Sequence, residues 1–218
     1  FSITSLNTQL VPNHNHSMDV LIPFLESGDV NDLRRRKLSG KQYGMPVMTN
    51  NLNKYVDFVK HFGSVEKLRT YLLTPAPVKE INDLSEQLGY SRNVSGDATD
   101  LKYPALILGP KIGEMYTALH GIEGTAPLDL WINRWMEVAT GDIVLDKDGK
   151  LQDVPRNDSI RNLMIEAILN IQKDLNEAGY DVDYGGTQAS IWVNMMNIFE
   201  NVQPSGRITD WGKHSKEY

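Results

Sequence analysis

The sequence predicts a mostly α-helical protein built as a single globular domain with one small β-hairpin. Two observations predict this class. Apolar residues recur at helical spacing in several segments that end at Gly or Pro, and strand-like runs do not alternate with helices along the chain. A chain of 218 residues can form one sizeable core. Its 40% hydrophobic and 23% charged content is typical of a soluble globular protein.

Residues 1–49 are predicted to form an irregular N-terminal arm that carries a basic cluster. Residues 1–28 have no clear period and contain Pro12 and Pro23. A basic run follows, which serves either to contact phosphates or to end a solvated helix near its negative dipole end. Because the first residue is Phe1 rather than Met, we expect a processed product or an excised module of a longer chain. The basic run comprises Arg34, Arg35, Arg36 and Lys37.

Residues 50–202 are predicted to form the helical domain, followed by a polar tail over 203–218. Gly63 is expected to end a first helix, and Ser64 to cap a second. Asp148-Gly149 indicates the turn of the small hairpin. The remaining predicted helices cover 78–88, a short segment from Lys111, 129–139, a long segment capped by Asn157 or Asp158, and a last helix opened by Thr187.

Composition narrows the function classes. The chain has no cysteine, which excludes disulfides, thiolate zinc sites and cysteine-ligated iron–sulfur clusters. His14-Asn15-His16 lacks an acidic or Cys companion and is better explained as a surface loop than as a metal site. No metal or other cofactor is predicted. The formal net charge of −6 argues mildly against a nucleic-acid partner, although a local basic face suffices to bind phosphates.

The segment from Tyr103 to Arg134 contains the best candidate site. Gly109-Pro110-Lys111 forms a tight turn that opens a short helix, and Asp129 begins the next helix 18 residues after Lys111. An amine at one helix start and a carboxylate at the next are therefore expected to share a site.

This segment resembles the helix-hairpin-helix DNA glycosylase superfamily, the endonuclease III-like group. Gly109-Pro110-Lys111 stands where the family has Gly-x-Lys at the end of its hairpin, and Leu128-Asp129-Leu130-Trp131-Ile132-Asn133-Arg134 stands where it has a Val-Asp-x-His-Val-x-Arg type segment. The resemblance covers residues 50–200 in architecture and 108–134 in motif. Ala105-Leu106-Ile107 replaces the usual Leu-Pro-Gly, and Trp131 replaces the usual His. The same pattern also resembles phage-borne and toxin-associated domains.

The resemblance implies an enzyme that flips out and excises a damaged or modified base of double-stranded DNA. It implies that Asp129 stabilises the positive charge of the sugar or activates the nucleophile, and that Lys111 forms a Schiff base if the enzyme is also an AP lyase. It also implies that the hairpin binds a phosphate through its backbone N–H groups. The candidate substrate-binding residues are Gly109, Gly113, Glu114, Trp131, Arg134 and Gln188.

Structural roles compete with each of these assignments. Asp129 is equally suited to cap its helix, and Lys111 to be a solvated first-turn residue. Trp131, Trp135 and Trp192 at helical spacing are more typical of a core than of a base-stacking wall. The alternatives are a non-catalytic module that binds DNA or protein, and the same chemistry used as a DNA-targeting toxin. We expect a soluble protein acting in the cytoplasm, encoded by a virus or delivered as an effector; the sequence does not indicate its oligomeric state.

Overall fold

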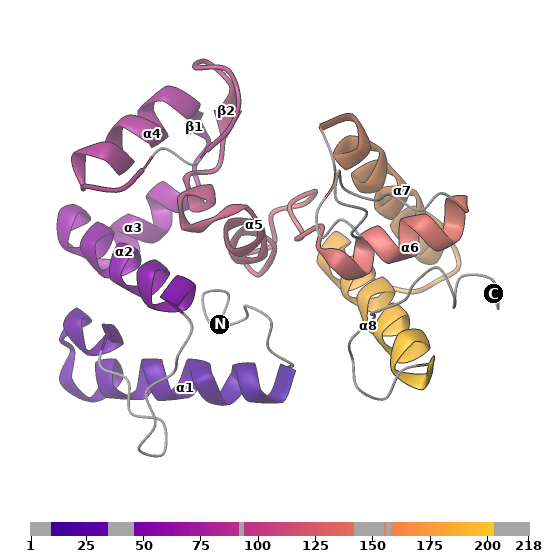
Figure 1. Cartoon of the computed structure of the whole chain (residues 1–218), viewed down its shortest axis with the longest axis horizontal. Coiled ribbons are helices and arrows are strands. Elements are labelled where there is room, and N and C mark those ends of the chain that lie inside the picture. Colours follow the sequence, from indigo (N-terminus) through magenta and orange to yellow (C-terminus); the bar gives the residue numbers. More distant parts are fainter. Residues whose placement is uncertain (1–9, 35–45, 92–93, 142–154, 156–157, 203–218) are drawn as a thin grey trace. The chain divides into compact units, whose positions relative to one another are not determined.

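The computed structural model describes residues 10–34, 46–91, 94–141, 155 and 158–202. The chain divides into two compact units, Phe1–Thr117 and Ala118–Tyr218, each described by itself below. The boundary falls at the end of α5 (Pro110–Ala118), inside the segment predicted to form one domain. The mostly α-helical class is confirmed (Figure 1). The predicted domain boundaries stay predictions.

Unit 1 contains four further helices, two short 3-10 helices and a two-stranded sheet among its described residues (Figure 1). The strands pair antiparallel, with Ala76 opposite Lys102 and Pro77 opposite Leu101. In chain order the elements are α1 (Leu10–Ser27), η2 (Val30–Arg34), α2 (Pro46–Phe62), α3 (Val65–Leu72), β1 (Ala76–Pro77), α4 (Val78–Gln87), β2 (Leu101–Lys102) and η3 (Pro104–Leu108).

The core of unit 1 consists of two apolar clusters. The larger one joins α2, α3 and α4 to η3; its buried members are Phe58, Val59, Leu68, Leu72, Val78, Ile81, Val94, Ala105 and Ile107. The smaller one joins α1 and η2 to α2 and to the start of α5; its buried members are Val20, Leu33, Leu52, Val56, Leu108 and Ile112. Both clusters include residues of η3, so the core fixes the segment that leads into Lys111.

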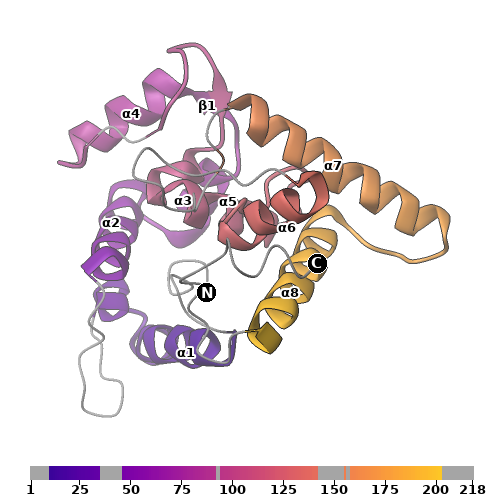
Figure 2. The same cartoon turned by 45° about the vertical axis from the view of Figure 1, so that its right-hand side comes forward.

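Unit 2 contains α6 (Leu130–Thr140), α7 (Asp158–Glu177) and α8 (Tyr184–Val202) among its described residues. Helix α8 packs against both α6 and α7 (Figure 2). The apolar cluster between the three helices is formed by Ala126, Leu128, Ile132, Met164, Ile168 and Tyr184. The loop before α6 therefore contributes to the same core as the helices.

Several predicted helix ends are confirmed. The Ser64 hydroxyl accepts a hydrogen bond from the Lys67 backbone N–H at 3.1 Å. Gly63 follows α2 with φ 82°, and Gly141 follows α6 with φ 75°, a left-handed conformation that glycine adopts without a steric penalty. Each of these helix ends is determined by one residue and its immediate neighbours, which is why it can be predicted from the sequence.

Residues 10–27 form helix α1, so the predicted irregular conformation of residues 1–28 is wrong there. Pro12 lies in the first turn, where a proline is tolerated, and Pro23 lies inside the helix. The Pro23 carbonyl accepts a hydrogen bond from the Ser27 hydroxyl at 2.9 Å. Val20 is buried and Phe24 half-buried against the smaller cluster. This packing outweighs the cost of the internal proline.

Two further predictions need correction, and three others fall outside the described residues. Helix α8 begins at Tyr184, three residues before the predicted Thr187. The two-stranded sheet formed by β1 and β2 was not predicted. The predicted turn at Asp148-Gly149, the tail over 203–218, and the three cations Arg35, Arg36 and Lys37 lie outside the described residues.

Replacing Gly113 with alanine should destabilise unit 1. A Cβ at this position would lie 2.5 Å from the Ala105 carbonyl oxygen and 2.7 Å from the Leu106 Cα, so α5 or η3 must shift. We expect a loss of about 2 kcal/mol, although an alanine in an unobstructed helix would gain roughly 1 kcal/mol. Circular dichroism during urea unfolding measures the change. The control is Gly185→Ala in α8, whose Cβ would meet only Asp183 Oδ1 at 3.7 Å; equal effects of the two substitutions would contradict the close approach.

Replacing Tyr71 with phenylalanine should stabilise unit 1, most strongly at alkaline pH. The ring of Tyr71 stacks on that of Phe62, with 4.7 Å between the ring centres. Its buried hydroxyl has no hydrogen-bond partner within the described part of the chain. Removing that hydroxyl should gain about 1 kcal/mol. Burial, with the nearby Glu80 charge, raises the Tyr71 pKa to about 12. An unfolded tyrosine loses its proton near pH 10. The unfolded state therefore binds fewer protons between pH 10 and 12, and this residue's contribution to stability is lost as pH rises.

Unfolding free energies of the wild type and Tyr71→Phe between pH 7 and 11 test this prediction. The difference in unfolding free energy between Tyr71→Phe and the wild type should increase above pH 10, because phenylalanine has no proton to lose. A variant that is less stable than the wild type at pH 7 would show that the hydroxyl is satisfied in solution.

Candidate functional site

Asp129 lies at the start of α6, as predicted. Its backbone is extended, and its Oδ1 accepts a hydrogen bond from the Trp131 backbone N–H at 3.0 Å. This is the geometry of an N-cap, which satisfies one of the N–H groups that a helix start leaves without an intrahelical acceptor. The capping role of Asp129 is therefore confirmed.

The Asp129 carboxylate also contacts a second helix. Its Oδ2 accepts a hydrogen bond from the Trp192 indole Nε1–H of α8 at 3.2 Å, and the residue is only 7% exposed. Two residues earlier, the Pro127 carbonyl accepts a hydrogen bond from Gln188 Nε2 at 2.9 Å. Helix α8 thus holds the loop before α6 at two points. The orientation of the carboxylate is set by two N–H donors from different elements.

An ion pair is buried on α6, one turn beyond the cap. Arg134 and Glu137 are 1% and 4% exposed, and Arg134 Nη1 lies 2.8 Å from Glu137 Oε2. Other buried polar residues of α6 and α8 are Asn133, Thr187 and Gln188. Arg134 therefore lies in the interior of unit 2, and its contact with a substrate stays a prediction.

The three tryptophans of the described part of unit 2 pack in its core. Trp131 and Trp135 lie against Met195, and Trp135 and Trp192 lie against the cluster that contains Ile132. All three are half-buried. Their positions agree with the core interpretation; base stacking stays a prediction.

Lys111 is the second residue of α5 and is half-buried. The turn before it is made by Gly109, whose φ of 109° favours glycine and whose N–H donates to the Leu106 carbonyl at 3.0 Å. Residues 105–107, which replace the family's usual Leu-Pro-Gly, lie within η3. Glu114, one turn after Lys111, is buried. The Gly-x-Lys segment therefore forms a tight turn followed by a helix, as predicted.

Lys111 belongs to unit 1 and Asp129 to unit 2. Each unit is described by itself, so a site shared by the amine and the carboxylate stays a prediction. The predicted phosphate contacts of the basic cluster stay a prediction too. Of its four residues only Arg34 is in the described part of the chain, as the last residue of η2.

A polar pocket in unit 1 was not predicted from the sequence. It has a volume of about 570 Å³ and lies between the first half of α2 and the turn after α4. Lys54 Nζ donates to the Ile107 carbonyl at 2.9 Å and lies 5.1 Å from the centre of the Tyr90 ring. Burial lowers the Lys54 pKa. The other lining residues are Asn50, Asn51, Asn53, Asp57 and Ser91.

The sequence contains a signal for this pocket. Three asparagines and a lysine occur within the five residues from Asn50 to Lys54, at the polar start of an amphipathic helix. A solvated helix face is the ordinary explanation of such a run. Only the return of the chain at Tyr90 converts this face into a pocket wall.

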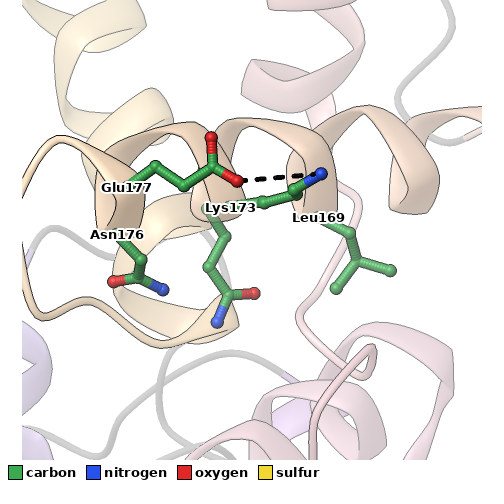
Figure 3. A pocket seen from close by; sticks show the side chains of 5 residues that line it. Leu169, Lys173, Asn176 and Glu177 are labelled. Carbon is green, nitrogen blue, oxygen red and sulfur yellow. Dashed lines mark ion pairs between the residues drawn. The ribbon is translucent and has the colours of Figure 1, made fainter.

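A second hollow lies on α7 in unit 2 (Figure 3). All its lining residues, among them Leu169 and Asn176, come from this one helix. Lys173 and Glu177 form an ion pair of 3.8 Å there, with side chains 71% and 67% exposed. An exposed pair on a single helix is ordinary surface structure, so we assign this hollow no chemical role.

The described residues contain no metal-binding cluster and no membrane-spanning helix. There, no group of three or more His, Asp or Glu side chains is placed to hold a metal ion. Among the same residues, none of the helices has the length and apolar character needed to cross a membrane.

No protein-family model, curated protein or solved structure matches this chain.

Proposed function

We propose that this protein is a DNA glycosylase-like enzyme that flips out and excises a damaged or modified base, with Asp129 as its catalytic carboxylate. The observation that carries the proposal is the fixed Asp129 side chain, held by the Trp131 backbone N–H and the Trp192 indole N–H. The Gly109-Pro110-Lys111 turn and its spacing to Asp129 also support it.

The chemistry needs a carboxylate whose position is fixed before the reaction. A glycosidic bond breaks through a transition state in which positive charge develops on the sugar. A negative group already oriented toward that charge stabilises it without reorganisation during the reaction. The two hydrogen bonds to Asp129 supply this fixed orientation.

Lys111 is proposed to add a lyase step. Its neutral amine attacks the sugar C1′ while the C1′–N bond to the base breaks and the base leaves with the electron pair, taking up a proton. Opening of the sugar ring then gives an imine between Lys111 and the sugar. Borohydride reduces such an imine to a stable amine, which makes the intermediate detectable.

The test uses the full chain and duplex DNA that contains uracil, an oxidised purine or an alkylated purine. Base release is measured by strand cleavage after alkali, and adducts are trapped with borohydride. The expected result is a covalent adduct that is lost in Lys111→Ala and retained in Lys60→Ala, which removes an exposed lysine of α2. Base release that survives Lys111→Ala without any adduct would show an enzyme without lyase activity. The absence of base release from every substrate would contradict the proposal.

The second candidate is a non-catalytic helical module that binds DNA or protein. The observation that favours it is that both Asp129 oxygens already accept hydrogen bonds within the chain and that the residue is almost completely buried. Such a module would bind DNA with a salt-dependent affinity and release no base. If the glycosylase chemistry served as a toxin, expression inside cells would be toxic and Asp129→Asn would abolish the toxicity.

A further inference from the structure

The polar pocket of unit 1 has a volume in the range of ligand sites. Its volume of about 570 Å³ lies within the range of roughly 300–1,000 Å³ that small-molecule sites occupy. The pocket is built by two segments far apart in the chain, α2 and the turn at Tyr90–Ser91. These segments are joined by a hydrogen bond from the Tyr90 hydroxyl to the Asp57 carboxylate. The wall is therefore fixed by tertiary contacts rather than by one exposed helix face.

The lining selects a polar occupant. Small-molecule sites are usually lined by apolar side chains with a few polar groups, whereas all seven residues around this pocket carry amide, hydroxyl or charged groups. An apolar ligand would remove these groups from water without offering them hydrogen bonds, at a cost of about 1–3 kcal/mol for each buried group. The occupant must present several donors and acceptors.

The charges of the lining select a neutral occupant. Lys54 and Asp57 are the two charged residues among the seven, and their charges are opposite. Lys54 already donates to the Ile107 carbonyl, and Asp57 accepts from Tyr90. A ligand of either charge would meet one like and one opposite charge, so the lining gives it no net attraction. Phosphates and amines are therefore disfavoured as the recognised group.

The amide side chains of the lining favour a ligand with a planar edge on which hydrogen-bond donors and acceptors alternate. A carboxamide carries an acceptor oxygen and an NH₂ donor in one plane, the geometry that pairs with two adjacent groups on a nucleobase edge. Asn50, Asn51 and Asn53 place three such amides in the lining. One face of the Tyr90 ring stacks on Phe58, and the ring also lies under Lys54 Nζ. Recognition therefore rests on hydrogen bonds to the base edge rather than on stacking.

We propose that this pocket binds a neutral nucleoside through the amides of Asn50, Asn51 and Asn53. The assignment rests on the lining of unit 1 alone and uses neither Asp129 nor Lys111, so it stands or falls separately from the proposed glycosylase activity. A nucleoside site in unit 1 would give the protein a means of contacting an unpaired base independently of the unit that carries Asp129.

The test is a nuclear magnetic resonance titration of the full chain with deoxyadenosine, deoxyguanosine, deoxycytidine and thymidine. Methyl glucoside, which is neutral and hydroxylated but carries no base, is titrated in parallel. We expect saturable shifts of α2 amide signals with at least one nucleoside and none with the glucoside. Asn50→Ala and Asn53→Ala should each weaken binding about fivefold, the effect of one lost hydrogen bond.

Two controls keep the test independent of folding. Asn194→Ala removes an exposed asparagine of α8 and should leave the affinity unchanged. A dispersed spectrum like that of the wild type shows that each variant is folded; Asn50 is exposed, so its replacement should not disturb the core. Absence of saturable shifts with all four nucleosides would overturn the proposal. So would shifts unaffected by both pocket variants, or equal binding of methyl glucoside.

Discussion

Asp129→Asn is expected to lower base release at least 100-fold while leaving the protein folded. Removing a positioned acid–base or charge-stabilising group typically costs about 10²–10⁴ in rate. Asparagine is as good an N-cap as aspartate, so its amide oxygen can keep the hydrogen bond to the Trp131 N–H. The substitution removes the negative charge and keeps the cap, although its NH₂ group cannot accept the hydrogen bond from the Trp192 indole N–H. Initial rates of base release under single-turnover conditions measure the effect.

Two further variants separate catalysis from capping. Asp129→Ala loses a cap worth about 1 kcal/mol and leaves the Trp192 indole N–H without this acceptor. Ser64→Ala loses the equivalent cap of α3 in unit 1. We expect Ser64→Ala to be destabilised by about 1 kcal/mol and to release base at the wild-type rate. If Asp129→Asn releases base as fast as the wild type, Asp129 is a cap alone and cannot be the catalytic carboxylate.

The part of this site that the sequence predicts is the part made by neighbouring residues. A cap bonds to an N–H two or three residues away, so Ser64 and Asp129 could be assigned their helix starts without any tertiary information. The same holds for Gly109, whose turn lies directly before Lys111. Each of these assignments depends on a few adjacent residues.

The remaining features depend on contacts between distant residues. The hydrogen bond from Trp192 to Asp129 joins residues 63 apart in the chain, and that from Lys54 to Ile107 joins residues 53 apart. Residue patterns carry no signal for such pairs. Helix α1 was missed for the same reason, because its proline signals are outweighed by the packing of Val20 and Phe24. The burial of Arg134 likewise depends on how α8 packs against α6.

Arg134→Met is expected to destabilise unit 2 by about 3–5 kcal/mol, because it removes the guanidinium that pairs with the buried Glu137 carboxylate. Glu137, with which Arg134 pairs at 2.8 Å, is only 4% exposed and cannot regain full hydration while α6 stays packed. Glu137→Leu should destabilise unit 2 by a similar amount, because it removes the carboxylate that pairs with the buried Arg134 guanidinium. All four tryptophans lie between residues 131 and 211, so tryptophan fluorescence during urea unfolding follows unit 2.

The double variant Arg134→Met/Glu137→Leu shows whether the stability losses of the single variants come from breaking the ion pair. Because it removes both charges and fills the space with apolar groups, it should be more stable than either single variant. The matched control is the exposed pair on α7, where Lys173→Met should cost less than about 1 kcal/mol. A double variant whose loss equals the sum of the two single losses would show that the side chains act independently. In that case the packing of α6 would be stabilised by its apolar contacts in the cluster that contains Ile132, and the ion pair would contribute little.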